Sequence, residues 1–119
     1  MDSNEFEELI LKYLKELPQK FKEQMKNLDI IVDYKNTSSS AFYSKENNTI
    51  LLGLFQGLPF TKKAGKSAIL PDKIIIYKKS LDAISSNDEE LAKNLKRVIL
   101  HEIGHYFGLD EKKLKDLGY

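Results

Sequence analysis

The sequence contains no cysteine among its 119 residues, which excludes disulfide bridges and thiolate chemistry. It has no run that approaches the roughly 20 apolar residues of a membrane-spanning helix. No basic, apolar leader follows Met1, because acidic residues come soon after it. We therefore expect a cytoplasmic protein without a membrane partner. An excess of one charge is also lacking, since 19 basic residues face 18 acidic ones, so nucleic acid is not expected as an obligatory partner.

Length and composition indicate a single domain over residues 1–119. Hydrophobic residues make up 41% of the chain, which is enough for a modest core. No internal repeat divides the sequence, and nothing in it specifies an oligomeric state. The domain must therefore be interpreted from its short periodic segments and from one motif near its end.

Apolar periodicity predicts several helices and strands in this domain. Pro18 suits the first turn of a helix that carries Phe21, Met25 and Leu28. Gly53 falls inside a predicted strand, where it indicates a bulge or the close approach of another backbone. The expected helices cover 4–17, about 18–28, about 87–107 and 111–117, the expected strands 30–34, 49–55 and 74–77, and the expected loop and turn 36–40 and 46–48.

The chain has only two histidines, His101 and His105, and Glu102 follows the first. Residues four apart on a helix leave from the same face, so both imidazoles can converge on one metal ion. Glu102 then lies beside the open coordination position, where a carboxylate can handle protons. This spacing on a helix is typical of zinc metalloproteases. It predicts a zinc site with His101 and His105 as two of its ligands.

Gly108 is expected to end this helix, because glycine adopts the left-handed conformation without a Cβ penalty. A turn at Gly108 would bring the carboxylate of Asp110 or Glu111 towards the metal. A catalytic zinc site takes three protein ligands and keeps the fourth position for water. We therefore expect the third ligand just beyond Gly108, at one of these two residues.

The helix that carries the motif is predicted to be buried. Ser86 and Glu89 have the spacing of a capping box, which places the start of the helix near Asn87. From Val98 to Leu109, Glu102 is the only residue that is charged at neutral pH, as expected for a central helix. Burying a carboxylate beside two imidazoles is unfavourable unless a cation pairs with them. The alternative is that the histidines bond to the backbone and Glu102 pairs with a lysine.

Segments along most of the chain match the pattern of one family. They are Leu17-Pro18 with Phe21, Ile30-Ile31-Val32, Leu51-Leu52-Gly53-Leu54-Phe55-Gln56-Gly57, Pro71-Asp72-Lys73-Ile74-Ile75-Ile76-Tyr77, and His101-Glu102-Ile103-Gly104-His105-Tyr106-Phe107-Gly108 with Leu114 and Leu117-Gly118-Tyr119. On these residues the chain resembles small bacterial zincin-like proteins described as minimal metallopeptidases. The resemblance implies an α+β fold, in which a small mixed sheet of about three strands is flanked by helices and a long central helix carries the metal site.

The same resemblance implies Zn2+ as the cofactor and peptides or proteins as substrates. It places the third ligand three residues beyond Gly108, and therefore favours Glu111 over Asp110. That family typically has an aspartate at this position, so the longer glutamate changes the reach. Larger relatives carry a methionine beneath the metal, whereas Met1 and Met25 of this chain lie far upstream of the motif.

As a zinc metallopeptidase, the protein would use Glu102 as the general base that takes a proton from the zinc-activated water and returns it to the leaving amine. Tyr77, Tyr106 and Tyr119 are candidates, on residue type alone, for stabilising the oxyanion, and each also suits simple packing. The strand over 49–55 would offer its edge to an extended substrate, or serve as an ordinary strand of the sheet.

Two other classes of function stay open. A bacterial endoribonuclease family that processes ribosomal RNA has histidines at matching spacing and a third histidine where this chain has Glu111. Six lysines over 61–80, at the end of a long connection that starts at Gln56, would suit RNA. The missing third histidine and the position of Glu102 favour the peptidase. The other alternative is a metal-stabilised interaction domain without turnover, because so small a chain leaves little room for a substrate cleft.

Overall fold

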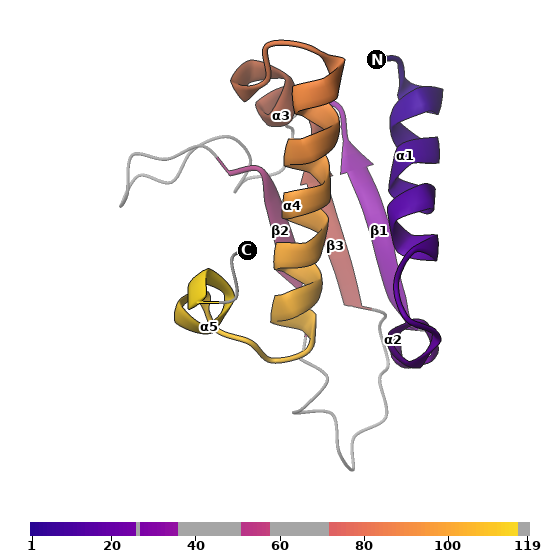
Figure 1. The fold of residues 1–119 in the computed structure, drawn as a ribbon, viewed down its shortest axis with the longest axis vertical. Coiled ribbons are helices and arrows are strands. Elements are labelled where there is room, and N and C mark those ends of the chain that lie inside the picture. Colours follow the sequence, from indigo (N-terminus) through magenta and orange to yellow (C-terminus); the bar gives the residue numbers. More distant parts are fainter. Residues whose placement is uncertain (26, 36–50, 58–71, 117–119) are drawn as a thin grey trace.

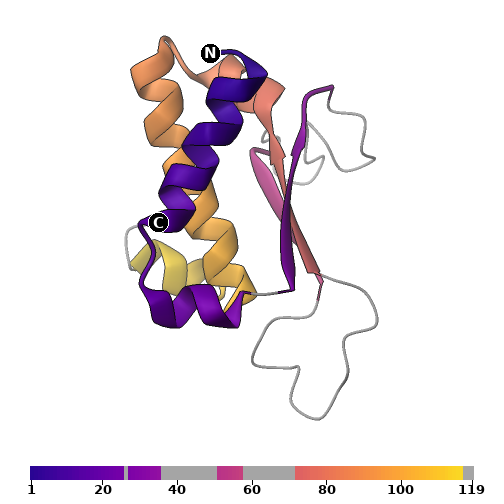
Figure 2. The same ribbon diagram turned by 90° about the vertical axis from the view of Figure 1, so that its right-hand side faces the viewer.

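The computed structural model describes residues 1–25, 27–35, 51–57 and 72–116 (Figure 1). Within these ranges, helices cover one face of a three-stranded sheet (Figure 2). None of the described helices is long and apolar enough to cross a membrane. The elements in chain order are α1 (Ser3–Lys15), α2 (Gln19–Gln24), β1 (Leu28–Asp33), β2 (Gly53–Gln56), β3 (Asp72–Tyr77), α3 (Lys78–Ile84), α4 (Asp88–Tyr106) and α5 (Glu111–Asp116).

The sheet is mixed and has the strand order β1-β3-β2. β1 runs parallel to β3, with Ile30 opposite Ile74. β2 runs antiparallel to β3, with Leu54 opposite Ile75. The α+β fold with a small mixed sheet is therefore confirmed. Because β3 lies in the middle, β1 and β2 form the two edges of the described sheet, and β2 is the edge that α4 contacts.

The core lies between the sheet and the helices on its covered face. Ile74 and Ile76 of β3 are completely buried against this layer, as are Leu95 of α4 and Phe6 of α1. Burying an aliphatic or aromatic side chain of this size contributes roughly 1.5–3 kcal/mol relative to leaving it exposed. The long helix is therefore fixed to the sheet along its inner side, which gives the motif near its C-terminal end a rigid base.

α4 begins next to where the sequence indicates, but a different residue caps it. Asn87 is the N-cap, and its side chain accepts a hydrogen bond of 2.8 Å from the backbone N–H of Glu90. The capping pair is thus shifted by one residue from the predicted Ser86 and Glu89. An amide oxygen fills the same role as a hydroxyl at this position. The acidic residues of the first turn also interact favourably with the positive, N-terminal end of the helix dipole.

Several other predicted bounds need correction. The second helix ends at Gln24, and Leu28 begins β1 instead of completing that helix. The second strand begins at Gly53; residues 51 and 52 precede it, and 49 and 50 lie outside the described residues. α3 was not expected, because it follows β3 directly and its N-cap, Tyr77, makes no side-chain capping bond. The predicted loop at 36–40, the turn at 46–48 and most of the connection after Gln56 also lie outside the described residues.

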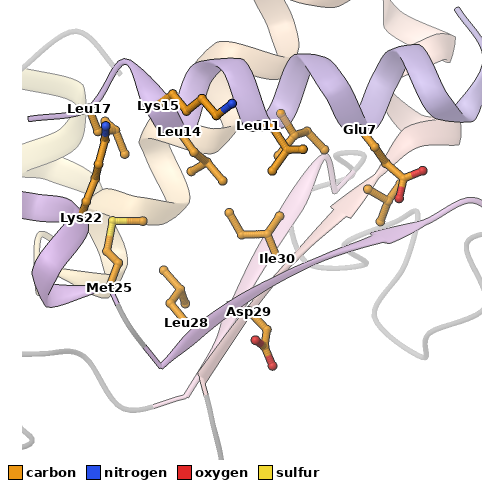
Figure 3. Close-up of a pocket in the computed structure, with 12 residues that line it drawn as sticks. Glu7, Leu11, Leu14, Lys15, Leu17, Lys22, Met25, Leu28, Asp29 and Ile30 are labelled. Carbon is orange, nitrogen blue, oxygen red and sulfur yellow. The ribbon is translucent and has the colours of Figure 1, made fainter. Parts of the chain in front are cut away.

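An apolar groove of about 520 Å³ lies between β1 and the first two helices, at the sheet edge far from β2 (Figure 3). Leu11 and Leu14 line it from α1, and Leu28 and Ile30 line it from β1. None of the residues that line this groove belongs to the histidine motif. The two edges of the sheet therefore differ in chemistry, and the titratable cluster of the motif lies towards the β2 edge.

Candidate metal centre

α4 places His101 and His105 on one face, as the four-residue spacing predicts. Their rings meet edge to face, with centroids 4.8 Å apart, and their Nε2 atoms lie 3.2 Å from each other. One candidate ligand atom from each of His101, Glu102 and His105 lies within 4.8 Å of the others. The predicted convergence of the motif is therefore present in the fold.

α4 ends at Tyr106, and a two-bond turn that contains Gly108 follows it. Gly108 has a φ of +90°, a left-handed conformation that favours glycine. Its N–H donates to the His105 carbonyl at 2.9 Å, and the Leu109 N–H donates to the Gly104 carbonyl at 3.0 Å. This pair of bonds is the Schellman motif, which satisfies carbonyls that the helix end would leave without partners. The predicted helix end is confirmed, and the chain turns back towards the histidines.

The turn also orients the second imidazole. His105 Nδ1 lies 3.0 Å from the Leu109 carbonyl oxygen. A carbonyl oxygen can only accept, so Nδ1 must carry the proton of this bond. In the neutral ring, Nε2 then holds a lone pair and faces the cluster. Such a backbone contact is the usual way in which a metal-binding histidine is held in the required tautomer.

Asp110 and Glu111 have different roles in the turn. The Asp110 carboxylate accepts a 2.8 Å hydrogen bond from the Lys113 N–H, and its carbonyl accepts one from the Leu114 N–H at 3.0 Å. Asp110 therefore caps α5. The Oε1 atom of Glu111 lies 2.7 Å from Nε2 of His105 and 3.1 Å from Nε2 of His101. The fold thus brings Glu111, and not the Asp110 side chain, to the two imidazoles.

These three donor atoms could hold a zinc ion. They form a triangle with sides of 3.2, 3.1 and 2.7 Å. Ligands at zinc–nitrogen and zinc–oxygen distances of 2.0–2.2 Å in a tetrahedral site are about 3.3 Å apart. The carboxylate and the Nε2 lone pair of neutral His105 also repel each other unless a cation or a proton lies between them. Both the spacing and the donor types therefore fit the metal that the motif predicts.

Glu102 lies beside this triangle in a more buried place. Only 8% of it is exposed, and its Oε1 accepts a 2.8 Å hydrogen bond from the Phe55 N–H of β2. Burial raises the pKa of Glu102 above the ordinary glutamate value, although the charges of His105 and His101 and the Phe55 bond oppose this shift. The alternative interpretation of the sequence paired Glu102 with a lysine. Within the described residues, the hydrogen bond to Glu102 comes from the backbone of β2 instead.

Glu111 is more exposed than Glu102, and its pKa moves in the other direction. Partial burial alone would raise the pKa of Glu111, but the hydrogen bonds and positive charges that His101 and His105 supply when they are protonated outweigh it. The net pKa is lowered, so Glu111 is ionised at neutral pH. An ionised carboxylate is the form that binds a metal ion.

Gly53 explains how β2 comes close enough to reach Glu102. A Cβ atom at Gly53 would lie 2.6 Å from Cγ1 of Val98 and 3.3 Å from Cγ of Glu102, so a larger residue would push the strand away from α4. The prediction at Gly53 was a bulge or the close approach of another backbone. The strand keeps its regular register with β3 at this point, and the groups that approach most closely are side chains of α4 instead of a backbone.

A cleft of about 550 Å³ lies between β2, the end of α4 and the turn that follows it. Glu102, His105 and Glu111 line its polar part. Its apolar part comes mainly from leucines, and the described lining includes Leu51, Leu54 and Leu109. The candidate metal centre is therefore open to a molecule that carries an apolar group.

Two of the three tyrosines suggested for the oxyanion are described, and neither lies in this cleft. Tyr106 is buried, and its hydroxyl donates to the Gln24 carbonyl at 2.8 Å, which ties α4 to the end of α2. Tyr77 is fully buried at the end of β3. Neither is among the described residues that line the cleft. Tyr119 lies outside the described residues.

Backbone groups of the site were missed by the sequence reasoning. The Phe55 N–H and the Leu109 carbonyl each hold a side chain of the motif. Every residue except proline has both of these groups, so no residue type marks them. The capping role of Asp110 has a sequence signal, because aspartate before a short helix is a preferred N-cap.

Together the α+β fold and the His-Glu-His cluster define a zincin-like protein. A family model described as zincin-like metallopeptidase matches residues 25–119, and the chain belongs to this family. The match includes the whole sheet, α4 and the turn to α5. A search of curated proteins finds no match.

Proposed function

We propose that this protein is a zinc-dependent metallopeptidase in which His101, His105 and Glu111 hold the metal and Glu102 is the general base. The observation that carries the proposal is the convergence of two imidazole Nε2 atoms and one carboxylate oxygen, all within 3.2 Å of one another, beside a buried glutamate. Zinc in such a site supplies Lewis-acid polarisation of a carbonyl and lowers the pKa of a water molecule.

Glu102 has the surroundings that a proton carrier needs. The Phe55 N–H holds its Oε1 atom, so Oε2 is the oxygen that would take a proton from water and later deliver it to the leaving amine. The raised pKa of Glu102 helps the first half of this task, because its carboxylate is then a stronger base than that of an ordinary glutamate. The same hydrogen bond keeps the carboxylate from swinging away from the histidines.

The cleft supports a peptide substrate with an apolar side chain next to the cleaved bond. Leucines line the same cleft as His105, and the other titratable groups of its described lining are all acidic. β2 is an edge strand of the described sheet, which is the arrangement that strand addition by an extended peptide requires. We therefore expect cleavage next to aliphatic residues, and better cleavage of basic than of acidic peptides.

A mixed peptide library tests this proposal. Wild-type protein loaded with one equivalent of zinc is incubated with the library, and new termini are identified by mass spectrometry. The Glu102→Gln variant keeps the shape of the side chain but removes the base, so it should retain zinc while cleavage falls by about 10²–10⁴-fold. The matched control is Glu89→Gln, an exposed position on the same helix, which should cleave like wild type. Cleavage that survives in Glu102→Gln would exclude the mechanism.

One observation favours the second candidate, a metal-stabilised interaction domain. The bond from Phe55 to Glu102 joins β2 to α4, so the glutamate also has a structural role that needs no turnover. In that case wild type and Glu102→Gln would be equally inactive on every peptide, while both bound zinc. The same incubation with single-stranded RNA tests the endoribonuclease alternative, which predicts cleavage of RNA and none of peptide.

A further inference from the structure

We infer that Gly104 and Leu114 form the contact that positions Glu111, so that the metal centre is complete only when α5 is docked on α4. This inference rests on the proposed function. Gly104 lies between the two histidines on α4, and Leu114 belongs to α5. Helix α5 follows the turn and lies beside the C-terminal half of α4 (Figure 1).

Gly104 leaves a notch in the surface of α4, and Leu114 fills it. A Cβ atom at position 104 would overlap Cδ2 of Leu114 and would lie 3.4 Å from its Cγ and 3.5 Å from its Cδ1. All three contacts are with one side chain. Glycine in the middle of a helix is less favourable than alanine, so its place here is explained by the close approach of α5 and not by the helix itself.

Leu114 is the anchor of α5. Only 1% of Leu114 is exposed, and it is the single buried residue of this helix. The other residues of the helix are exposed and hold it to the fold by no comparable apolar contact. Among the described residues, the apolar contact that positions α5 relative to α4 is therefore made by one leucine in one notch, and it acts together with the hydrogen-bonded turn and the contacts of Glu111 with the two imidazoles.

The position of Leu114 determines that of Glu111, because both residues lie on the short helix α5. Residues three apart on a helix are neighbours on its surface, so Glu111 starts from the same side of α5 as Leu114. Asp110 caps the helix between the turn and this pair. When Leu114 is seated, Oε1 of Glu111 reaches both imidazoles. A shift of α5 would therefore move the backbone from which Glu111 reaches the imidazoles.

A set of four variants tests the contact, with zinc affinity measured by competition with a chelator. Gly104→Ala fills the notch and Leu114→Ala removes the anchor, and each should weaken zinc binding by about 10- to 100-fold, as loss of a group that orients a ligand usually does. The fold-loss of zinc affinity in the double variant should be smaller than the product of the fold-losses in the two single variants, because both substitutions remove the same contact. Leu91→Ala is the control, since it removes a buried leucine from α4 far from the site and should leave the zinc affinity of the folded protein unchanged.

Hydrogen exchange gives a second readout that a loss of general stability would not reproduce. Zinc should slow exchange of the α5 amides, including the Lys113 and Leu114 N–H groups that bond to Asp110, in wild type and in Leu91→Ala but not in Leu114→Ala. Should Leu114→Ala not fold, Leu114→Val removes one methylene group and should give a smaller loss in the same direction.

The outcomes separate this inference from the proposed function. Wild-type zinc affinity in both Gly104→Ala and Leu114→Ala would overturn the role of the contact while leaving the metal centre intact. Additive losses in the double variant would also overturn it, because the two residues would then act independently. No zinc binding by wild type would overturn the proposed function, and the inference with it.

Discussion

Helix α4 is 19 residues long and buries eight of them, whereas α5 is six residues long and buries only Leu114. The candidate metal centre takes its two histidines and Glu102 from the first helix and Glu111 from the second. The histidines therefore belong to a helix that packs into the core, α4. Glu111 belongs to α5, which contacts the core through Leu114 and is connected to α4 by the hydrogen-bonded turn. This difference predicts that damage to the two halves of the site will have different consequences.

Replacing the histidines should have the largest effect on the metal. Wild-type protein should bind about one zinc ion per chain, and His101→Ala with His105→Ala should abolish measurable binding, because two of three donors are lost. α4 should stay folded, since its buried residues are unchanged and alanine favours helix. Metal analysis after dialysis gives the stoichiometry, and circular dichroism gives the helix content. A double variant that retained its zinc would show that the metal lies elsewhere.

Changing the two acids after Gly108 sharpens the comparison within the α5 half. Glu111→Ala should weaken zinc binding by about 100-fold or more, because it removes a donor while the protein remains folded. Asp110→Ala removes the cap of α5, which is worth about 1 kcal/mol for a typical N-cap, and should weaken zinc binding by tenfold or less. Chelator competition on both variants ranks them. The reverse ranking would assign the third ligand to Asp110.

The smallest expected effect concerns the stability of the metal-free protein at different pH values. The pKa of Glu102 is raised in the folded state by burial, so the folded protein holds this proton to higher pH than the unfolded chain does. The stability that the protonated carboxyl contributes is complete below the unfolded pKa and is lost as pH rises through the folded pKa. The glutamine side chain of Glu102→Gln does not titrate. The melting temperature of this variant, relative to that of wild type, should therefore increase as pH rises from about 4 to 7.

The difference between the two proteins cancels the titration of groups that do not interact with Glu102, and it retains that of Glu102 and of the neighbours coupled to it. Metal-free wild type and Glu102→Gln are melted in parallel at each pH, and the gap in melting temperature is followed. A gap that does not change with pH would mean that the folded and unfolded pKa values of Glu102 are the same. Glu111→Gln is a useful contrast, because the lowered pKa of Glu111 adds stability above its unfolded pKa that is lost as pH falls.

Local patterns in the chain were sufficient for much of the fold. The presence of α1, the end of α4 just before Gly108 and the short α5 follow from apolar spacing, capping chemistry and one glycine, all of which act over a few residues. The end of α1 at Lys15 comes two residues before the predicted end at 17. α3 and the shifted start of β1 were not predicted. The short helix α3 has weak periodicity and no side-chain capping bond. The first residue of β1 is set by its pairing with β3, which lies far along the chain.

Within the site, the meeting of His101 and His105 follows from the sequence alone, because a helix of 3.6 residues per turn places positions four apart on the same face. The bond from Phe55 to Glu102 joins residues 47 positions apart, and it exists only because Gly53 lets β2 approach α4. Likewise, Asp110 and Glu111 are adjacent carboxylates, and the spacing after Gly108 could not separate their roles. The capped turn and the seating of Leu114 against Gly104 decide between them, since side-chain direction after a turn depends on how the next helix packs.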